Sequence, residues 1–240
     1  MSKLKINISN NILEEKIEQY SNIFPELKDS LSPKLLQVQS LLNTGILNKD
    51  SYDLFKPTNE FQLNMTLSLF RDDYINRYGF YLVSEDFLEK SVKLFGNKKI
   101  LEVGAGSGFL SSCLEYNGLD IIATDKHIEN NPYGFYNNNK NLIEVDSIQF
   151  LKENKNNFDV ILMSWPDYSS NFADTILKHM KADQILIYIG ESYGGCTAND
   201  NFFDRLEKST ILLENETLEF KNSSFSWFGI HDKVRIYQKL

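Results

Sequence analysis

The chain has 240 residues, of which 42% are hydrophobic and 24% are charged. These fractions are ordinary for a globular protein, so an intrinsically disordered or collagen-like chain is excluded. Acidic residues outnumber basic ones by 33 to 25, which gives a net charge of −8. This balance argues against bulk nucleic-acid binding, because such binding depends on neutralising phosphates with lysine and arginine.

The two cysteines and three histidines are too few and too widely spaced to predict a disulfide framework or a metal site. No run of about 18 apolar residues predicts a membrane-spanning helix. The first residues, MSKLKINISNN, lack the apolar segment of a signal peptide. We therefore expect a cytoplasmic protein that neither holds a metal nor binds a membrane, while the oligomeric state stays open.

The first part of the chain, to about residue 95, has apolar residues at helical spacing. Ser32 and Ser84 are the expected N-caps of two helices, because a serine hydroxyl can accept a hydrogen bond from the first turn. Gly45 and Gly96 are the expected ends of the same two helices. Helices are predicted over residues 12–24, 33–44, 61–77 and 85–95.

From about residue 98 onward, short apolar runs alternate with helical stretches, which is typical of a parallel sheet with crossover helices. The predicted strands cover residues 98–103, 119–124, 142–145, 158–164, 184–189 and 233–238. The predicted helices cover residues 107–116, 171–180 and 201–208. The tail leaves no room for a long crossover helix between its last strands, so we expect an antiparallel hairpin there.

A glycine cluster, ILEVGAGSGF over residues 100–109, lies between a predicted strand and a predicted helix. Gly104 and Gly106 allow the backbone to turn and to approach a ligand closely, and the helix start offers free N–H groups. A dinucleotide-binding loop has the pattern G-x-G-x-x-G, whereas Phe109 stands here at the third glycine position. Glu102 is poorly placed beside a pyrophosphate and suits a cationic ligand.

The segment LEVGAGSG, residues 101–108, resembles motif I of the class I S-adenosylmethionine-dependent methyltransferases. The resemblance implies a Rossmann-like α/β fold with a seven-stranded, mostly parallel sheet and an antiparallel C-terminal hairpin. It also implies S-adenosyl-L-methionine as the cofactor. We expect this methyltransferase domain over residues 81–240 and an N-terminal helical cap over residues 1–80.

The resemblance assigns roles around the methionine end of the cofactor. Glu102 is expected to bind the ammonium group, and Gly104, Ala105 and Gly106 are expected to line the cofactor's floor. Tyr81 lies in the segment that covers the methionine end in many members of the family. Each feature also has a structural explanation, since glycines permit close helix–strand packing and aromatic residues can fill a seam.

Polar residues at two further strand ends extend the resemblance. Asp125 ends the second predicted strand, where the family keeps an acidic residue for the ribose hydroxyls, and a carboxylate can accept from both of them. Asp146 and Ser147 end the third strand, where the family places a polar residue against the adenine amino group. Alone, Asp125 could be a solvated strand end and Asp146 a helix cap. Their joint occurrence in chain order favours cofactor binding.

The catalytic candidates lie after the fourth and fifth predicted strands. The run SWPDY, residues 164–168, resembles the Asn/Asp-Pro-Pro-Tyr motif of amino methyltransferases, but it has one proline and an intervening Trp165. Ser164 and Tyr168 are the candidates there, although Trp165 could instead pack against the N-terminal helices. Glu191, in a second glycine-bearing loop, could bind a cationic acceptor or act as a base, or could simply be exposed in a turn.

The sequence therefore predicts a methyltransferase that acts on a small or planar acceptor. The alternatives are an N-methyltransferase that modifies an amino group of nucleic acid or protein, and a catalytically silent module that binds the cofactor. A nicotinamide-dependent oxidoreductase is a further alternative, which the glycine spacing disfavours.

Overall fold

The computed structural model describes residue 18 and residues 34–55, 67–68, 70–128 and 140–240. The helix expected over residues 12–24, the N-cap expected at Ser32 and the first turns of the helix expected over residues 61–77 lie outside this description, apart from isolated residues. All predicted elements from residue 85 onward lie within it.

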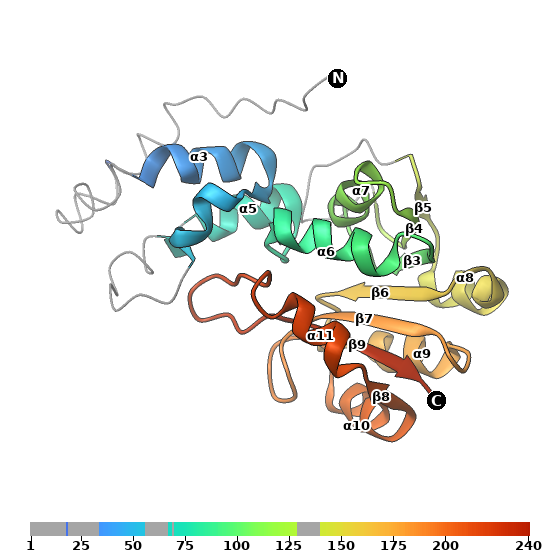
Figure 1. The fold of residues 1–240 in the computed structure, drawn as a ribbon. Helices are drawn as coiled ribbons and strands as arrows, with labels where there is room; N and C mark the ends of the chain where they lie inside the picture. Colours follow the sequence, from blue (N-terminus) through green and yellow to red (C-terminus); the bar gives the residue numbers. More distant parts are fainter. Residues whose placement is uncertain (1–17, 19–33, 56–66, 69, 129–139) are drawn as a thin grey trace.

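A seven-stranded sheet in the order β5-β4-β3-β6-β7-β9-β8 forms the centre of the molecule (Figure 1). Its strands are β3 (Lys99–Val103), β4 (Asp120–Asp125), β5 (Leu142–Glu144), β6 (Val160–Ser164), β7 (Ile185–Gly190), β8 (Thr210–Leu212) and β9 (Lys233–Lys239). The first five strands pair in parallel, whereas β9 lies antiparallel between β7 and β8. The expected Rossmann-like sheet and its antiparallel C-terminal pairing are confirmed.

Helices cover both faces of the sheet. One face is covered by α6 (Glu85–Phe95), α7 (Phe109–Tyr116) and α11 (Glu214–Phe220), and the other by α8 (Ser147–Asn154), α9 (Phe172–His179) and α10 (Asp200–Ser209). Along β6, Val160 and Leu162 belong to the first core cluster, and Ile161 and Met163 belong to the second. This burial on both faces explains the continuous apolar run of that strand.

Local sequence signals account for the start and end of several helices. Ser84 Oγ accepts a hydrogen bond from Phe87 N at 3.2 Å, which confirms the predicted N-cap of α6. Gly45 ends α3 (Leu35–Thr44) with a φ of 71°, a left-handed conformation that glycine adopts readily. The helix predicted over residues 107–116 begins two residues later in the structure. Gly108 has a φ of 73°, and α7 begins at Phe109.

Two helices were not predicted. The first, α8, begins immediately after Asp146, whose side chain accepts from the backbone N–H groups of Ile148 and Gln149. The second, α11, lies in the connection from β8 to β9. This helix has seven residues, Glu214–Phe220.

The N-terminal elements share the core cluster beneath α6 and α7. They comprise α3, β1 (Ile46–Leu47), the 3-10 helix η2 (Lys49–Leu54), α5 (Arg71–Tyr78) and β2 (Val83–Ser84). The fully buried Tyr74 donates its hydroxyl to Gly45 O at 2.7 Å and accepts from Val83 N at 3.2 Å. This hydroxyl joins α5 to both strands of the small parallel pair β1–β2. The division into a cap over residues 1–80 and a domain over residues 81–240 stays a prediction.

None of the helices in the described part of the chain combines the length and the apolar character needed to cross a membrane.

Replacing Tyr74 with Phe is expected to lower the free energy of unfolding by about 1–3 kcal/mol, because it leaves buried backbone groups unpaired. Chemical denaturation measures this loss. The matched control is Tyr116→Phe, since the Tyr116 side chain is 87% exposed. That control is expected to change stability by less than about 0.5 kcal/mol. Equal effects of the two substitutions would contradict the role of the Tyr74 hydroxyl.

Candidate functional site

A cavity of about 210 Å³ opens at the carboxyl edge of the sheet, beside the ends of β3, β4 and β6. After β3 the chain continues to β4 and β5 on one side, and it then returns to place β6 on the other side. Open α/β sheets bind ligands at this kind of switch point. Seven predicted site residues line the cavity: Tyr81, Glu102, Gly104, Ala105, Gly106, Asp125 and Ser164.

Glu102 is the more deeply buried of the two acidic residues that line the cavity. Its side chain is 2% exposed, and its Oε2 atom has no hydrogen-bond partner among the described residues. Burial raises the pKa of Glu102 to about 8, against the lowering effect of hydrogen bonds from Ser111, and the charge of Asp125 raises it further. A buried carboxyl group without a counter-charge suits a cationic ligand group.

The glycine loop turns tightly and is held by two side chains from neighbouring elements. Gly104 and Gly106 have φ values of 67° and 58°, which side chains rarely tolerate. The N–H of Gly106 donates to Asp125 Oδ2 at 2.8 Å, and the N–H of Gly104 donates to Ser147 Oγ at 3.2 Å. The second oxygen of Asp125 accepts from His127 N at 2.9 Å. Asp125 therefore shapes the loop as well as facing the cavity.

The two residues predicted for the adenine end do not line the cavity. Asp146 Oδ1 accepts from Ile148 N and Gln149 N, which is the helix-cap geometry considered above. Ser147 is buried and donates to Thr124 O at 3.1 Å, behind the glycine loop. Ser147 thus supports the loop from behind, and the contact of both residues with adenine stays a prediction.

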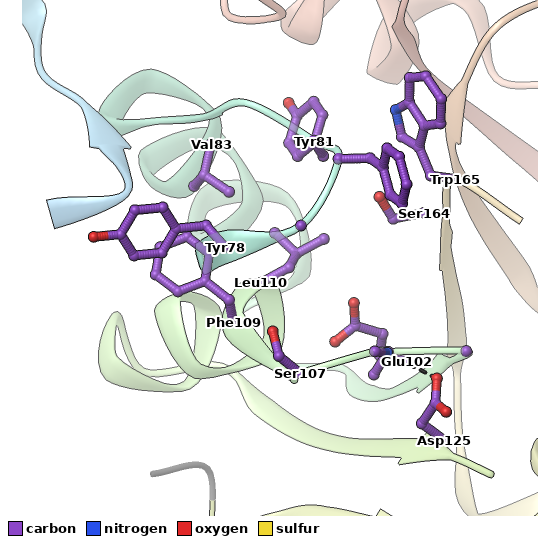
Figure 2. A pocket seen from close by; sticks show the side chains of 15 residues that line it. Tyr78, Tyr81, Val83, Glu102, Ser107, Phe109, Leu110, Asp125, Ser164 and Trp165 are labelled. Atoms are coloured by element: carbon purple, nitrogen blue, oxygen red, sulfur yellow. Dashed lines mark hydrogen bonds between the residues drawn. The ribbon is translucent and has the colours of Figure 1, made fainter. Parts of the chain in front are cut away.

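The exit of β6 brings one catalytic candidate into the cavity and leaves the other outside. Figure 2 shows Ser164 and Trp165 on the side of the cavity opposite to Glu102 and Asp125. Trp165 has a φ of 50° and stacks on Phe80, with ring centroids 5.0 Å apart and planes 15° apart. Tyr168 is 61% exposed and is not among the residues that line the cavity.

Glu191 also lies outside the lining of the cavity. Its Oε2 accepts from Cys196 N at 2.8 Å and its Oε1 accepts from His231 N at 3.0 Å. Burial raises the pKa of Glu191, but these hydrogen bonds outweigh burial, and the pKa lies below its ordinary value. Glu191 therefore joins the loop after β7 to the segment that precedes β9.

Sequence reasoning assigned no site role to three aromatic residues that line the cavity, Tyr78, Phe80 and Phe109. The sequence contained a signal for Phe109, because this residue directly follows the glycine loop, and the loop itself lines the cavity. Phe80 comes from the segment before α6, and no local pattern places that segment over β6. Its position depends on contacts that are distant in sequence.

No protein-family model and no curated protein matches the chain. Among solved structures, TehB from Haemophilus influenzae is 14% identical, with 71% of this chain and 66% of that chain covered and a TM-score of 0.43. A TehB-like SAM-dependent methyltransferase from Corynebacterium glutamicum is 16% identical, with 65% and 88% covered and a TM-score of 0.42. The N-methyltransferase NodS from Bradyrhizobium japonicum WM9 is 12% identical, with 63% and 91% covered and a TM-score of 0.39.

The chain thus spans slightly less than two thirds of the Haemophilus influenzae protein. The order of the seven strands, with β9 antiparallel between β7 and β8, decides the fold. The chain has a Rossmann-like α/β fold, as the resemblance of residues 101–108 implies. In this fold, the cavity lies at the switch point between β3 and β6, and Glu102 is the next-to-last residue of β3.

The raised pKa of Glu102 makes the stability of the ligand-free protein depend on pH. Its ordinary pKa is 4.5 and its folded value is about 8, so the folded state binds the proton more tightly. Stability is expected to decline between these pH values, by about 1.4 kcal/mol per pH unit from this group. Glu102→Gln is expected to remove that part of the decline, as measured by denaturation at several pH values. The exposed control Glu153→Gln is expected to leave it in place.

Replacing Glu191 with Gln is expected to destabilise the protein at pH 7 by about 1–3 kcal/mol, because an amide is uncharged and offers only one acceptor oxygen to two part-buried N–H groups. Glu153→Gln serves as the control here as well. Hydrogen exchange of the Cys196 and His231 amides gives the local measurement. Unchanged protection of both amides would contradict the joining role of Glu191.

Proposed function

We propose that this protein is an S-adenosylmethionine-dependent methyltransferase that acts on a small or planar acceptor in the cytoplasm. One observation carries the proposal: a buried carboxyl group with an unpartnered oxygen faces the switch-point cavity, next to a second acidic residue at the end of the adjacent strand. This pair requires a ligand that offers a cationic group and hydrogen-bond donors.

The residues of the cavity fit such a cofactor. Glu102 would bind the ammonium group, and its carboxyl would ionise when that charge arrives. Asp125 would accept from the ribose hydroxyls with the lone pairs that the loop N–H groups leave open. Gly104, Ala105 and Gly106 would form the floor, because the absence of larger side chains lets a ligand approach the backbone. When bound, S-adenosylmethionine supplies a methyl group on a positively charged sulfur.

The remaining lining residues would orient the acceptor and exclude water. Tyr81, Phe80 and Trp165 offer aromatic surface on the side opposite to the acidic residues. Enclosure by such surface lowers the local dielectric and limits the geometries in which two reactants can meet. Ser164 lies at the exit of β6 and could hydrogen-bond the acceptor.

The acceptor class follows from charge and from the character of the cavity wall. A net charge of −8 makes bulk nucleic acid a poor partner, and the aromatic wall favours a planar small molecule. Modification of an amino group in nucleic acid or protein is the alternative, which the resemblance of SWPDY to amino methyltransferases favours. A module that binds the cofactor without turnover would share every feature of the cavity.

Asp125→Ala is expected to weaken binding of S-adenosylhomocysteine, the demethylated product, by about tenfold or more, which corresponds to about 1.4 kcal/mol. Isothermal titration calorimetry measures the change. The matched control is Asp120→Ala, because Asp120 is exposed at the opposite end of the same strand. Affinity is expected to be unchanged in that control.

Three outcomes separate the alternatives. Absence of heat with both S-adenosylmethionine and S-adenosylhomocysteine in the unmodified protein would disprove the proposal. Binding without transfer of a labelled methyl group to any cell fraction would indicate the silent module. Label in macromolecules alone would indicate the nucleic-acid or protein acceptor.

A further inference from the structure

Trp165 has a backbone conformation that is rare for its residue type and its position. Its φ is 50°, although the residue is bulky and directly precedes Pro166, which favours an extended backbone there. The N–H of Trp165 donates to Ile189 O at 2.9 Å, and the N–H of Ala198 donates to Pro166 O at 2.9 Å. Hydrogen bonds to β7 and to the loop after it therefore hold the backbone in this conformation. Residues with such strain cluster at functional sites.

The indole ring of Trp165 forms part of the cavity wall. It lines the cavity and stacks on Phe80, with ring centroids 5.0 Å apart. Figure 2 shows the ring on the side opposite to Glu102. The proposed cofactor would occupy the side of Glu102 and Asp125, so the indole would face the space left for the acceptor. A group that fixes the angle of this ring therefore shapes the acceptor side of the cavity.

The polar edge of the indole is buried beside the carboxyl group of Asp232. Trp165 Nε1 and both carboxyl oxygens of Asp232 are buried and complete no hydrogen bond among the described residues. The two groups are neighbours nevertheless, because the Trp165 N–H lowers the pKa of Asp232. Buried polar groups are almost always paired, so this open donor and open acceptor are complementary partners. Asp232 does not line the cavity, so it acts on a ligand only through Trp165.

The backbone on both sides of Asp232 is tied to β7 and the loop after it. Asp232 directly precedes β9, whose first residue, Lys233, pairs with Gly190 at the end of β7. On its other side, the N–H of His231 donates to Glu191 Oε1 at 3.0 Å. Asp232 therefore has a defined position beside the indole.

Charged groups from two other elements act on Asp232. Burial raises the pKa of Asp232 to about 7, against the lowering effect of the Trp165 N–H. The charge of Glu191 raises this pKa further, and the guanidinium of Arg71 lowers it. Three more titratable side chains interact with Asp232, and burial raises the pKa of each: Tyr81, Tyr188 and Cys196. They are uncharged at neutral pH, so the ionised carboxyl group is opposed by Glu191 and favoured by Arg71.

We propose that Asp232 is a positioning residue: it holds the indole of Trp165 by its N–H and so sets the wall against which a planar acceptor lies. Ionisation of Asp232 completes the hydrogen bond, because a carboxylate attracts the N–H more strongly than a protonated carboxyl group does. The acceptor part of this inference rests on the proposed function. The pairing of Asp232 with Trp165 can be tested without it.

The indole N–H signals of isotope-labelled protein test the pairing by NMR. The chain has two tryptophans, Trp165 and Trp227, and Trp165→Phe assigns the two signals by removing one. The Trp165 signal of the ligand-free protein is expected to move downfield as pH rises, with a midpoint at about 7, because Asp232 then ionises. The Trp227 ring packs on Phe55 and Tyr74, and its signal is the internal control, which is expected to move less.

Asp232→Asn is expected to abolish this movement of the Trp165 signal, because an amide does not ionise. The matched control is Asp167→Asn, which makes the same change at an exposed residue after β6 and is expected to keep the movement. If Asp232→Asn does not fold, Arg71→Gln provides the second variant. It is expected to raise the midpoint, since the charge of Arg71 lowers the pKa of Asp232.

A Trp165 signal that does not respond to pH would overturn the pairing. So would a response that persists in Asp232→Asn, because it would belong to another group such as His231, or, where only Arg71→Gln folds, a midpoint that stays in place.

Phenol, a planar probe, tests the effect on the cavity wall. Its binding is measured by ligand-observed NMR with saturating S-adenosylhomocysteine, about one pH unit above and below the midpoint. The unmodified protein and Asp167→Asn are expected to bind phenol about threefold more tightly at the higher pH, because a fixed ring loses less freedom on binding. Asp232→Asn is expected to bind it equally at both pH values. No saturable binding, or equal binding by the unmodified protein, would overturn the role in the wall.

Calorimetry with S-adenosylhomocysteine separates this inference from the proposed function, because folded Asp232→Asn is expected to keep the unmodified protein's affinity. If the unmodified protein fails to bind S-adenosylhomocysteine while the Asp232-dependent movement of the Trp165 signal persists, the proposed function fails and the pairing stands.

Discussion

The position of Glu102 at the end of β3 constrains the whole site, because the strand delivers its carboxyl into the cavity just before the chain turns. Solvent cannot stabilise the ionised form there, and its Oε2 has no partner among the described residues. The carboxyl therefore retains its proton to a pH near 8 in the free protein. A cationic ligand, as we propose for this cavity, would reverse this preference, since its charge would replace the lost hydration. Glu102 would then couple ligand binding to its own ionisation.

The glycine loop depends on acidic and hydroxyl side chains from the neighbouring strand ends. Asp125 and Ser147 accept hydrogen bonds from the loop N–H groups, so the positive φ values of Gly104 and Gly106 are held from outside the loop. One consequence is that a single substitution of Asp125 changes the support of the loop and the wall of the cavity together. A ligand that donates to Asp125 would also stabilise the loop on which it lies.

The antiparallel strand β9 brings a segment that precedes a strand to the carboxyl edge of the sheet. In a fully parallel sheet, only residues that follow strands reach this edge. The reversal of β9 brings the residue that precedes it, Asp232, to the same edge, and Glu191 fastens the two chain segments together. Tyr81 and Trp165 then lie between Asp232 and the cavity, from elements far apart in the chain.

The sequence by itself determined three local features: the apolar run of β6, the N-cap at Ser84 and the glycine loop. Each of these features depends on neighbours within a few residues. It also indicated Glu102 and Asp125, because the ends of parallel strands meet at one edge. Only the tertiary structure decided that Tyr168 lies outside the cavity and that both oxygens of Glu191 are occupied. It alone brought His231 to Glu191, since a contact across 40 residues depends on strand pairing and packing, which leave no local pattern in the sequence.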